Sequence, residues 1–206
     1  AVAKTHYGLA IEQTKRLMEL EPSVTSHQWN LVVASLNSGG PDMELGLHDE
    51  LVLRWQETVP VLEKLIASEP ENQRYRQVQA MLQSNIAIIL RDLGQLEAAI
   101  VPLRAAASIL RLQAEALDYS PESYLPVALN HFELAQTLIK LERVEVAELE
   151  LAECNKIVDE ILQRDPAFIS AMNQRLDNNL MRFEIEKAKK EIDFKTLQAI
   201  SVHSLT

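Results

Sequence analysis

The residues that could support catalysis or metal binding are scattered along this chain of 206 residues. No two of its five histidines have the i, i+4 spacing, with a carboxylate, that a helical zinc site needs. The sequence also lacks a glycine-rich phosphate loop, a serine nucleophile elbow and the Glu-x-x-His pairs of a di-iron bundle. We therefore expect a non-catalytic protein with no metal site and no cofactor, and an all-α enzyme is the least favoured alternative. The histidines are His6, His27, His48, His131 and His203.

Cys154 is the only cysteine, so no disulfide can form within the chain. It lies three residues after Leu151 and four before Val158, on the apolar stripe of an expected helix. We interpret Cys154 as a buried packing thiol and not as a nucleophile.

The charge of the chain disfavours nucleic acid as a partner. The net charge is −10, whereas phosphate binding needs clustered lysine and arginine. The one local group of lysines, around residues 187–190, alternates with glutamates, which is typical of a solvated helix face. No apolar run approaches the ~20 residues of a membrane span, and no signal peptide is visible. We expect a cytoplasmic protein that binds neither nucleic acid nor membrane.

Two segments of the chain share one pattern of apolar and small residues. Residues 85–107 and 131–154 match at a constant offset of 48 residues, which pairs Ala87 with Ala135 and Leu103 with Leu151. A repeated helix–turn–helix unit cannot bury its own apolar face and must pack on a neighbour. The offset therefore predicts an all-α solenoid of antiparallel helix pairs.

The rest of the pattern predicts about eight or nine helices in a single domain over residues 1–206. The run Ser38-Gly39-Gly40-Pro41 predicts a loop from Ser38 to Gly46, which we interpret as an insertion. Residues 167–206 are expected to form capping helices, one over about 167–191 and a short one near 194–203. Because the chain starts without methionine and inside an apolar-periodic stretch, we interpret it as a C-terminal piece of a longer protein. The apolar residues of the 167–191 helix are Phe168, Met172, Leu176, Leu180 and Phe183.

The segment NIAIILRDLGQLEAAI resembles a tetratricopeptide repeat. A small residue on a first helix, Leu93-Gly94 at the turn and Ala98-Ala99 on a second helix carry the resemblance. The long period and the junction AIEQTKRLMELEPSVTSHQWNLVVASL are similar to long-period bacterial arrays, which are often appended to kinase or winged-helix regulators. The resemblance implies a protein-binding or scaffolding module whose first helices line a concave groove.

The resemblance also implies which side chains line that groove. Asn85 falls where carboxylate-binding members of the family carry an asparagine, but Glu133 and Gln136 stand where basic companions are expected. Arg91 and Lys140 are cations in an acidic chain and favour an acidic or carboxylate-bearing segment as partner. The implied positions are Ser84, Asn85, Ile88, Arg91, Asp92, Phe132, Glu133, Gln136 and Lys140.

Two functions follow from these observations. The first is a protein–protein interaction module with a protein or peptide partner, for which end-to-end stacking is a route to homo-oligomers. The alternative is a small-ligand sensing domain of a bacterial regulator, in which the same helices enclose the ligand. An open, wet groove would favour the first, and a cavity lined by polar and aromatic side chains would favour the second.

Overall fold

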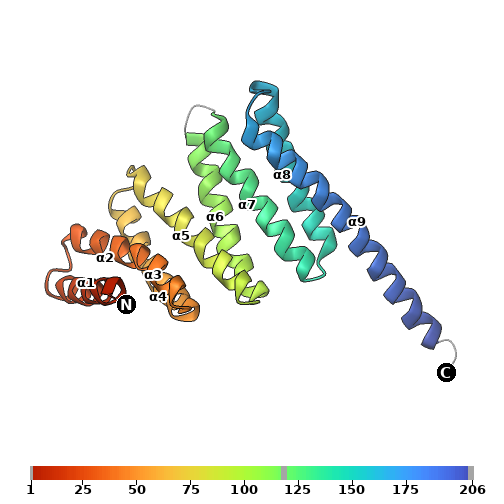
Figure 1. The fold of residues 1–206 in the computed structure, drawn as a ribbon. Helices are drawn as coiled ribbons and strands as arrows, with labels where there is room; N and C mark the ends of the chain where they lie inside the picture. Colours follow the sequence, from red (N-terminus) through yellow and green to blue (C-terminus); the bar gives the residue numbers. More distant parts are fainter. Residues whose placement is uncertain (1, 117–119, 204–206) are drawn as a thin grey trace. The chain divides into compact units, whose positions relative to one another are not determined.

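The computed structural model describes residues 2–116 and 120–203, with the backbone alone for 193 and 195–203. Over these ranges the chain forms nine helices and no strand, which confirms the all-α prediction (Figure 1). None of the described helices combines the length and apolar composition of a membrane span. The helices are α1 (Val2–Leu20), α2 (Thr25–Asn37), α3 (Gly39–Glu44), α4 (His48–Ser68), α5 (Gln73–Asp92), α6 (Leu96–Ala116), α7 (Pro121–Lys140), α8 (Val144–Arg164) and α9 (Ile169–His203).

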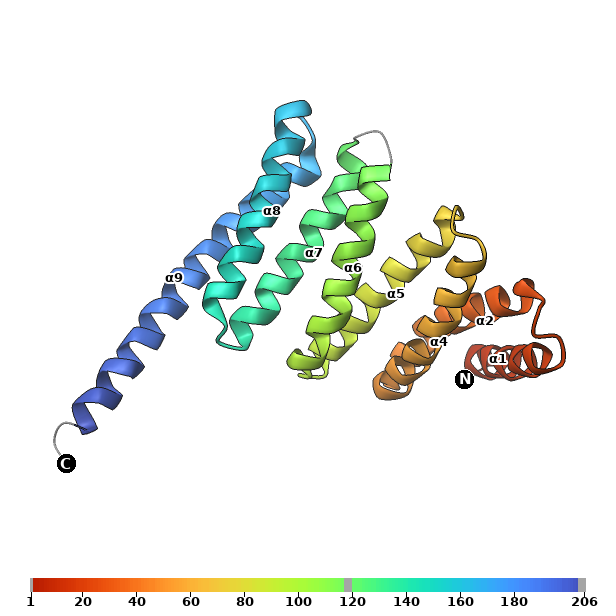
Figure 2. The ribbon, with the colours of Figure 1, turned by 180° about the vertical axis from the view of Figure 1, so that it is seen from behind.

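The chain forms two compact units, one of residues 1–109 and one of residues 110–206, so the boundary falls within α6. In unit 1, α2 packs against α1 and α4, and α4 packs against α5. In unit 2, α7, α8 and α9 contact one another, and α7 and α8 run antiparallel (Figure 2).

The helix boundaries repeat with the same period as the sequence pattern. Helices α1, α4 and α8 end at positions separated by one or two periods, and the helices that follow α1, α4, α6 and α8 begin one period apart. The repeat therefore extends beyond the two segments in which the sequence pattern is clearest. The ends are Leu20, Ser68 and Arg164, and the starts are Thr25, Gln73, Pro121 and Ile169.

The residues that defined the repeat are buried at equivalent places. Ala87 and Ala135 are fully buried, and Leu103 and Leu151 are 1% and 4% exposed. A small residue at the alanine position allows close approach of a neighbouring helix, whereas the leucine position fills the space between helices. The burial predicted at these matched positions is confirmed.

The turns that follow α3, α5 and α7 share one backbone conformation at one register position. Gly46, Gly94 and Glu142 have φ of 71°, 74° and 57°, and each is separated from the next by one period of the repeat. Glycine adopts this left-handed region without strain, whereas a side chain there costs about 1–2 kcal/mol. The next register position is Lys190, where α9 continues as a helix and no turn forms.

The prediction of an inserted loop from Ser38 to Gly46 is wrong. Residues 39–44 form α3, and α2 with α3 occupies the same register positions as α5, so nothing is inserted. Gly39 is needed for close packing and not for a loop, because a Cβ there would lie 2.6 Å from Cζ2 of Trp55. Trp55 is buried and donates a hydrogen bond from Nε1 to the carbonyl of Ser35 at 2.9 Å.

The core of unit 2 forms where α7 and α8 meet. Ala128 of α7 lies in one cluster with Cys154, Ile157, Val158 and Ile161 of α8. Partly buried side chains close its edge, among them Tyr124, Phe132 and Phe168. We call this group the unit 2 core cluster.

The prediction of two capping helices over 167–206 is wrong, because residues 169–203 form the single helix α9, which runs along α8 and continues past its end (Figures 1 and 2). Phe168 is partly buried, but the other apolar residues that defined the predicted helix are exposed. The face of α9 toward α8 instead mixes apolar and polar residues, so hydrophobic periodicity in the sequence does not identify it as the buried face. The exposed residues are Met172, Leu176, Leu180 and Phe183, and the buried ones are Ala171, Gln174, Asn178, Met181 and Ile185.

Candidate functional site

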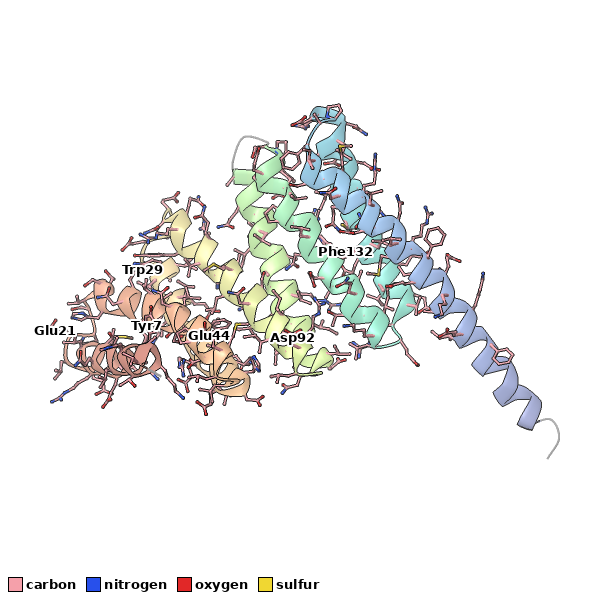
Figure 3. The ribbon with its side chains drawn as sticks, viewed as in Figure 1. Tyr7, Glu21, Trp29, Glu44, Asp92 and Phe132 are labelled. Carbon is pink, nitrogen blue, oxygen red and sulfur yellow. The ribbon has the colours of Figure 1, made fainter. Side chains whose placement is uncertain are left out.

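The groove positions predicted on α5 lie in unit 1. Ser84, Asn85 and Arg91 are half-buried, whereas Ile88 and Asp92 are exposed, with Asp92 at the end of the helix (Figure 3). Burial lowers the pKa of Arg91, an effect that the nearby carboxylate of Asp92 partly opposes. Arg91 is therefore partly desolvated within the fold.

The positions predicted on α7 lie in unit 2. Phe132 packs against the unit 2 core cluster, and Glu133 and Gln136 are half-buried (Figure 3). Lys140 is exposed in the last turn of α7, where a cation interacts favourably with the helix dipole.

The predicted residues are thus divided between the two units. Of the two cations predicted to favour an acidic partner, Lys140 is exposed and Arg91 is half-buried, as is Gln136. Arg91 and Gln136 interact with other parts of the protein. Their role in binding a partner stays a prediction.

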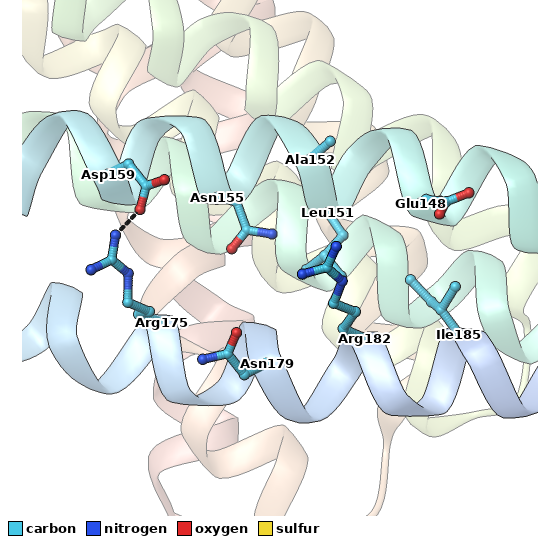
Figure 4. A pocket seen from close by; sticks show the side chains of 9 residues that line it. All are labelled: Glu148, Leu151, Ala152, Asn155, Asp159, Arg175, Asn179, Arg182 and Ile185. Carbon is cyan, nitrogen blue, oxygen red and sulfur yellow. Dashed lines mark hydrogen bonds and ion pairs between the residues drawn. The ribbon is translucent and has the colours of Figure 1, made fainter.

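A surface groove in unit 2 lies between α8 and α9 and has a volume of about 490 Å³ (Figure 4). Each wall is one side of a helix, on which most lining residues are charged or amide side chains three or four positions apart, and Leu151, Ala152 and Ile185 are apolar. The lining residues are Glu148, Leu151, Ala152, Asn155 and Asp159 of α8, and Arg175, Asn179, Arg182 and Ile185 of α9.

Ion pairs close both ends of this groove. Arg175 pairs with Asp159 at one end. Nζ of Lys189 lies 2.7 Å from a carboxylate oxygen of Glu148 at the other, and this hydrogen bond raises the pKa of Lys189. Arg182, between them, has no ion-pair or hydrogen-bond partner among the described residues and reaches from α9 toward α8 (Figure 4). Among the charged residues that line the groove, Arg182 is therefore the one without an ion-pair partner in the described part of the chain.

A network of amide side chains lies beneath the groove. Oδ1 of Asn178 accepts hydrogen bonds from Nε2 of Gln174 at 2.8 Å and from the thiol of Cys154 at 3.3 Å. Nδ2 of Asn178 donates to Oδ1 of Asn155 at 3.0 Å. Because these bonds satisfy polar groups that water cannot reach, Gln174 and Asn178 are tolerated in the interface of α8 and α9.

Cys154 and His131, the side chains best suited to nucleophilic or acid–base chemistry, are both engaged in contacts within unit 2. Burial raises the pKa of the Cys154 thiol to about 11, so the thiol stays protonated and inert near neutral pH. Nδ1 of His131 lies 2.7 Å from Oε2 of Glu150, and its Nε2 lies 3.4 Å from Nη2 of Arg111, which joins three helices of unit 2. In the described part of the chain, no three His, Cys, Asp or Glu side chains are placed to hold a metal ion.

We did not predict Asn155, Asn179 or Arg182 as site residues from the sequence. The available signal was a pair of polar stripes, from Glu148 to Asp159 and from Arg175 to Arg182, with spacings of three and four residues. Such stripes are also typical of ordinary solvated helix faces, so the spacing alone does not identify a groove.

No protein-family model matches the sequence, and no curated protein matches it. Among solved structures the chain is similar to BtubC (BKLC) from P. vanneervenii, with 13% identity over 94% of this chain and 91% of that chain. The TM-score is 0.33, and a similarity this weak carries no inference about fold or function.

Proposed function

We propose that the chain is a non-catalytic protein-interaction module, built as a tetratricopeptide-like array of helix pairs, which binds an extended peptide segment in the groove between α8 and α9. The observation that carries this proposal is Arg182, which lies in the groove between two ion pairs and has no partner among the described residues. An unpaired guanidinium presents donors that match a carboxylate in geometry and charge.

The polar character of the groove also favours a peptide. The side-chain amide of Asn179 can donate to and accept from a peptide backbone, and that of Asn155 has donor capacity left after accepting from Asn178. We therefore expect a segment that carries an aspartate, a glutamate or a C-terminal carboxylate opposite Arg182.

The small-ligand alternative receives less support. A volume of about 490 Å³ lies within the range of small-molecule sites, but such sites are mostly apolar and often aromatic. None of the nine residues that line this groove is aromatic, and most of them are charged or amide side chains. The lining favours a peptide that brings its own polar groups.

The test is selection of a display library of random peptides against the chain, followed by titration of the selected synthetic peptides. We expect carboxylate-bearing peptides whose affinity falls roughly tenfold or more in Arg182→Ala, because a charge-assisted hydrogen bond is lost. Lys140→Ala, at the exposed position of the groove implied by the resemblance, is the matched control on α7 and should bind as the wild type does.

Two results would contradict the proposal. A peptide whose affinity depends on Lys140 and not on Arg182 would place the binding surface on α7. Selected peptides without a carboxylate, or with equal affinity for both variants, would remove the groove between α8 and α9 as the binding site.

A further inference from the structure

Helix α9 carries an apolar stripe that no described residue covers. Its side chains are 48–73% exposed, and they extend along the first half of the helix. On a helix these positions lie on the side opposite the buried face that packs on α8. The stripe consists of Ile169, Met172, Leu176, Leu180 and Phe183, and we call it the α9 stripe.

The repeat shows what covers this face elsewhere in unit 2. One period earlier in the chain, Met172, Leu176 and Leu180 correspond to Tyr124, Ala128 and Phe132 of α7, and these three belong to or pack against the unit 2 core cluster formed with α8. The same face of α7 is therefore covered by a helix. On α9 it is open, because no turn forms at position 190 and α9 continues to residue 203.

The spacing of residues in the α9 stripe indicates that a second copy of the chain packs on it. The spacings along the α9 stripe are three, four, four and three residues, which read the same in both directions about Leu176. We propose that two copies pair through antiparallel α9 helices about a twofold axis at Leu176. Ile169 then meets the partner's Phe183, Met172 meets the partner's Leu180, and Leu176 meets the partner's Leu176. Such a contact is isologous and closes at two subunits.

The apolar area is close to what a dimer needs. With side chains of roughly 150–200 Å² each, the exposed fractions of the stripe amount to roughly 500–600 Å² per copy. A stable interface buries about 800 Å² per partner, and polar residues at the edge of the stripe supply the remainder.

The charges beside the stripe predict a signature of this arrangement. Arg175 is held by Asp159 of its own chain, which leaves Asp177 as the charge nearest the axis, opposite the partner's Asp177. Like charges so placed weaken association, and each chain carries a net charge of −10. Added salt and Asp177→Asn should therefore both strengthen the dimer, whereas a dimer held by ion pairs would weaken in salt.

The experiment is sedimentation equilibrium of the chain and two matched variants. Leu176→Glu places a charge on the axis from both copies and should weaken dimerisation roughly a hundredfold or more. Leu149→Glu is the control, because Leu149 is a similarly exposed leucine, 68% against 63%, on α8. Both substitutions leave the core untouched, so circular dichroism should show unchanged folding.

Cysteine cross-linking tests the geometry. Leu176→Cys should form a disulfide with its own copy far faster than Leu149→Cys, while Ile169→Cys alone should not and should cross-link only when mixed with Phe183→Cys. Cys154 is buried and does not interfere. A monomeric wild type at its highest soluble concentration, or equal rates for Leu176→Cys and Leu149→Cys, would overturn the proposal. Self-cross-linking of Ile169→Cys would overturn the antiparallel arrangement.

Discussion

Two adjacent glycines of α3 should respond oppositely to the same substitution. A Cβ at Gly39 would lie 2.6 Å from Cζ2 and 3.3 Å from Cη2 of Trp55, whereas a Cβ at Gly40 meets nothing within 4 Å. Trp55 is 4% exposed and bonded to Ser35, so its ring cannot move away freely. Overpacking of this kind costs about 1–3 kcal/mol.

The helix preference of alanine over glycine applies at both positions, so the difference between the two variants reports the clash with Trp55. Alanine is favoured over glycine in a helix by up to about 1 kcal/mol, and this gain applies to both positions. Gly40→Ala should therefore stabilise the fold by up to about 1 kcal/mol, and Gly39→Ala should be less stable than Gly40→Ala by about 1–3 kcal/mol. For a chain of this length, that gap is roughly 2–12 °C in melting temperature.

Thermal and urea unfolding followed by circular dichroism would measure the two variants. In a Trp55→Phe background the penalty of Gly39→Ala should shrink, because the two atoms that the new Cβ meets belong to the ring that phenylalanine lacks. Equal melting temperatures for Gly39→Ala and Gly40→Ala would refute the reasoning, as would a penalty that survives the removal of the indole.

Three further predictions test the repeat and the buried thiol. Leu103→Ala and Leu151→Ala should each lower the free energy of unfolding by about 2–5 kcal/mol in denaturant unfolding, because both leucines are buried at equivalent places. Unchanged stability in either variant would contradict the predicted register. Glu142→Gly should raise the melting temperature by relieving left-handed strain worth about 1–2 kcal/mol, and a lower value would show that the side chain stabilises the turn. The pKa of Cys154 is raised from 9.0 to about 11, so the folded state keeps a proton that the unfolded state loses. The free energy of unfolding should therefore fall as pH rises from about 9 to about 11, more than in Cys154→Ala, and parallel pH curves for the two proteins would contradict the shift.

The candidate site was only partly accessible from the sequence. The resemblance to a repeat family implied a set of groove positions, but Phe132 packs against the unit 2 core cluster and Arg91 is partly desolvated. Arg182 could be noticed in the sequence as one charge among many. Its lack of a partner among the described residues depends on which carboxylates lie opposite α9, and that is a property of the tertiary arrangement.

The sequence by itself determined the helical class and the period of the repeat. Both arise from local physics, because a helix needs an apolar face at its own spacing and a turn needs a residue that tolerates positive φ, as at Gly94. At Gly39 the same local signals gave a wrong prediction of a loop. The glycine there allows close packing against Trp55 of the next helix, α4.

Only the tertiary structure decided which face of α9 is buried. The helix carries the apolar α9 stripe on one side and a mixed face on the other, and hydrophobicity alone favours burial of the stripe. The mixed face can be buried against α8 because Asn178 bonds to Gln174, Cys154 and Asn155, which offsets the cost of burying the amides. That compensation needs two helices at hydrogen-bonding distance, so no pattern within α9 could reveal it.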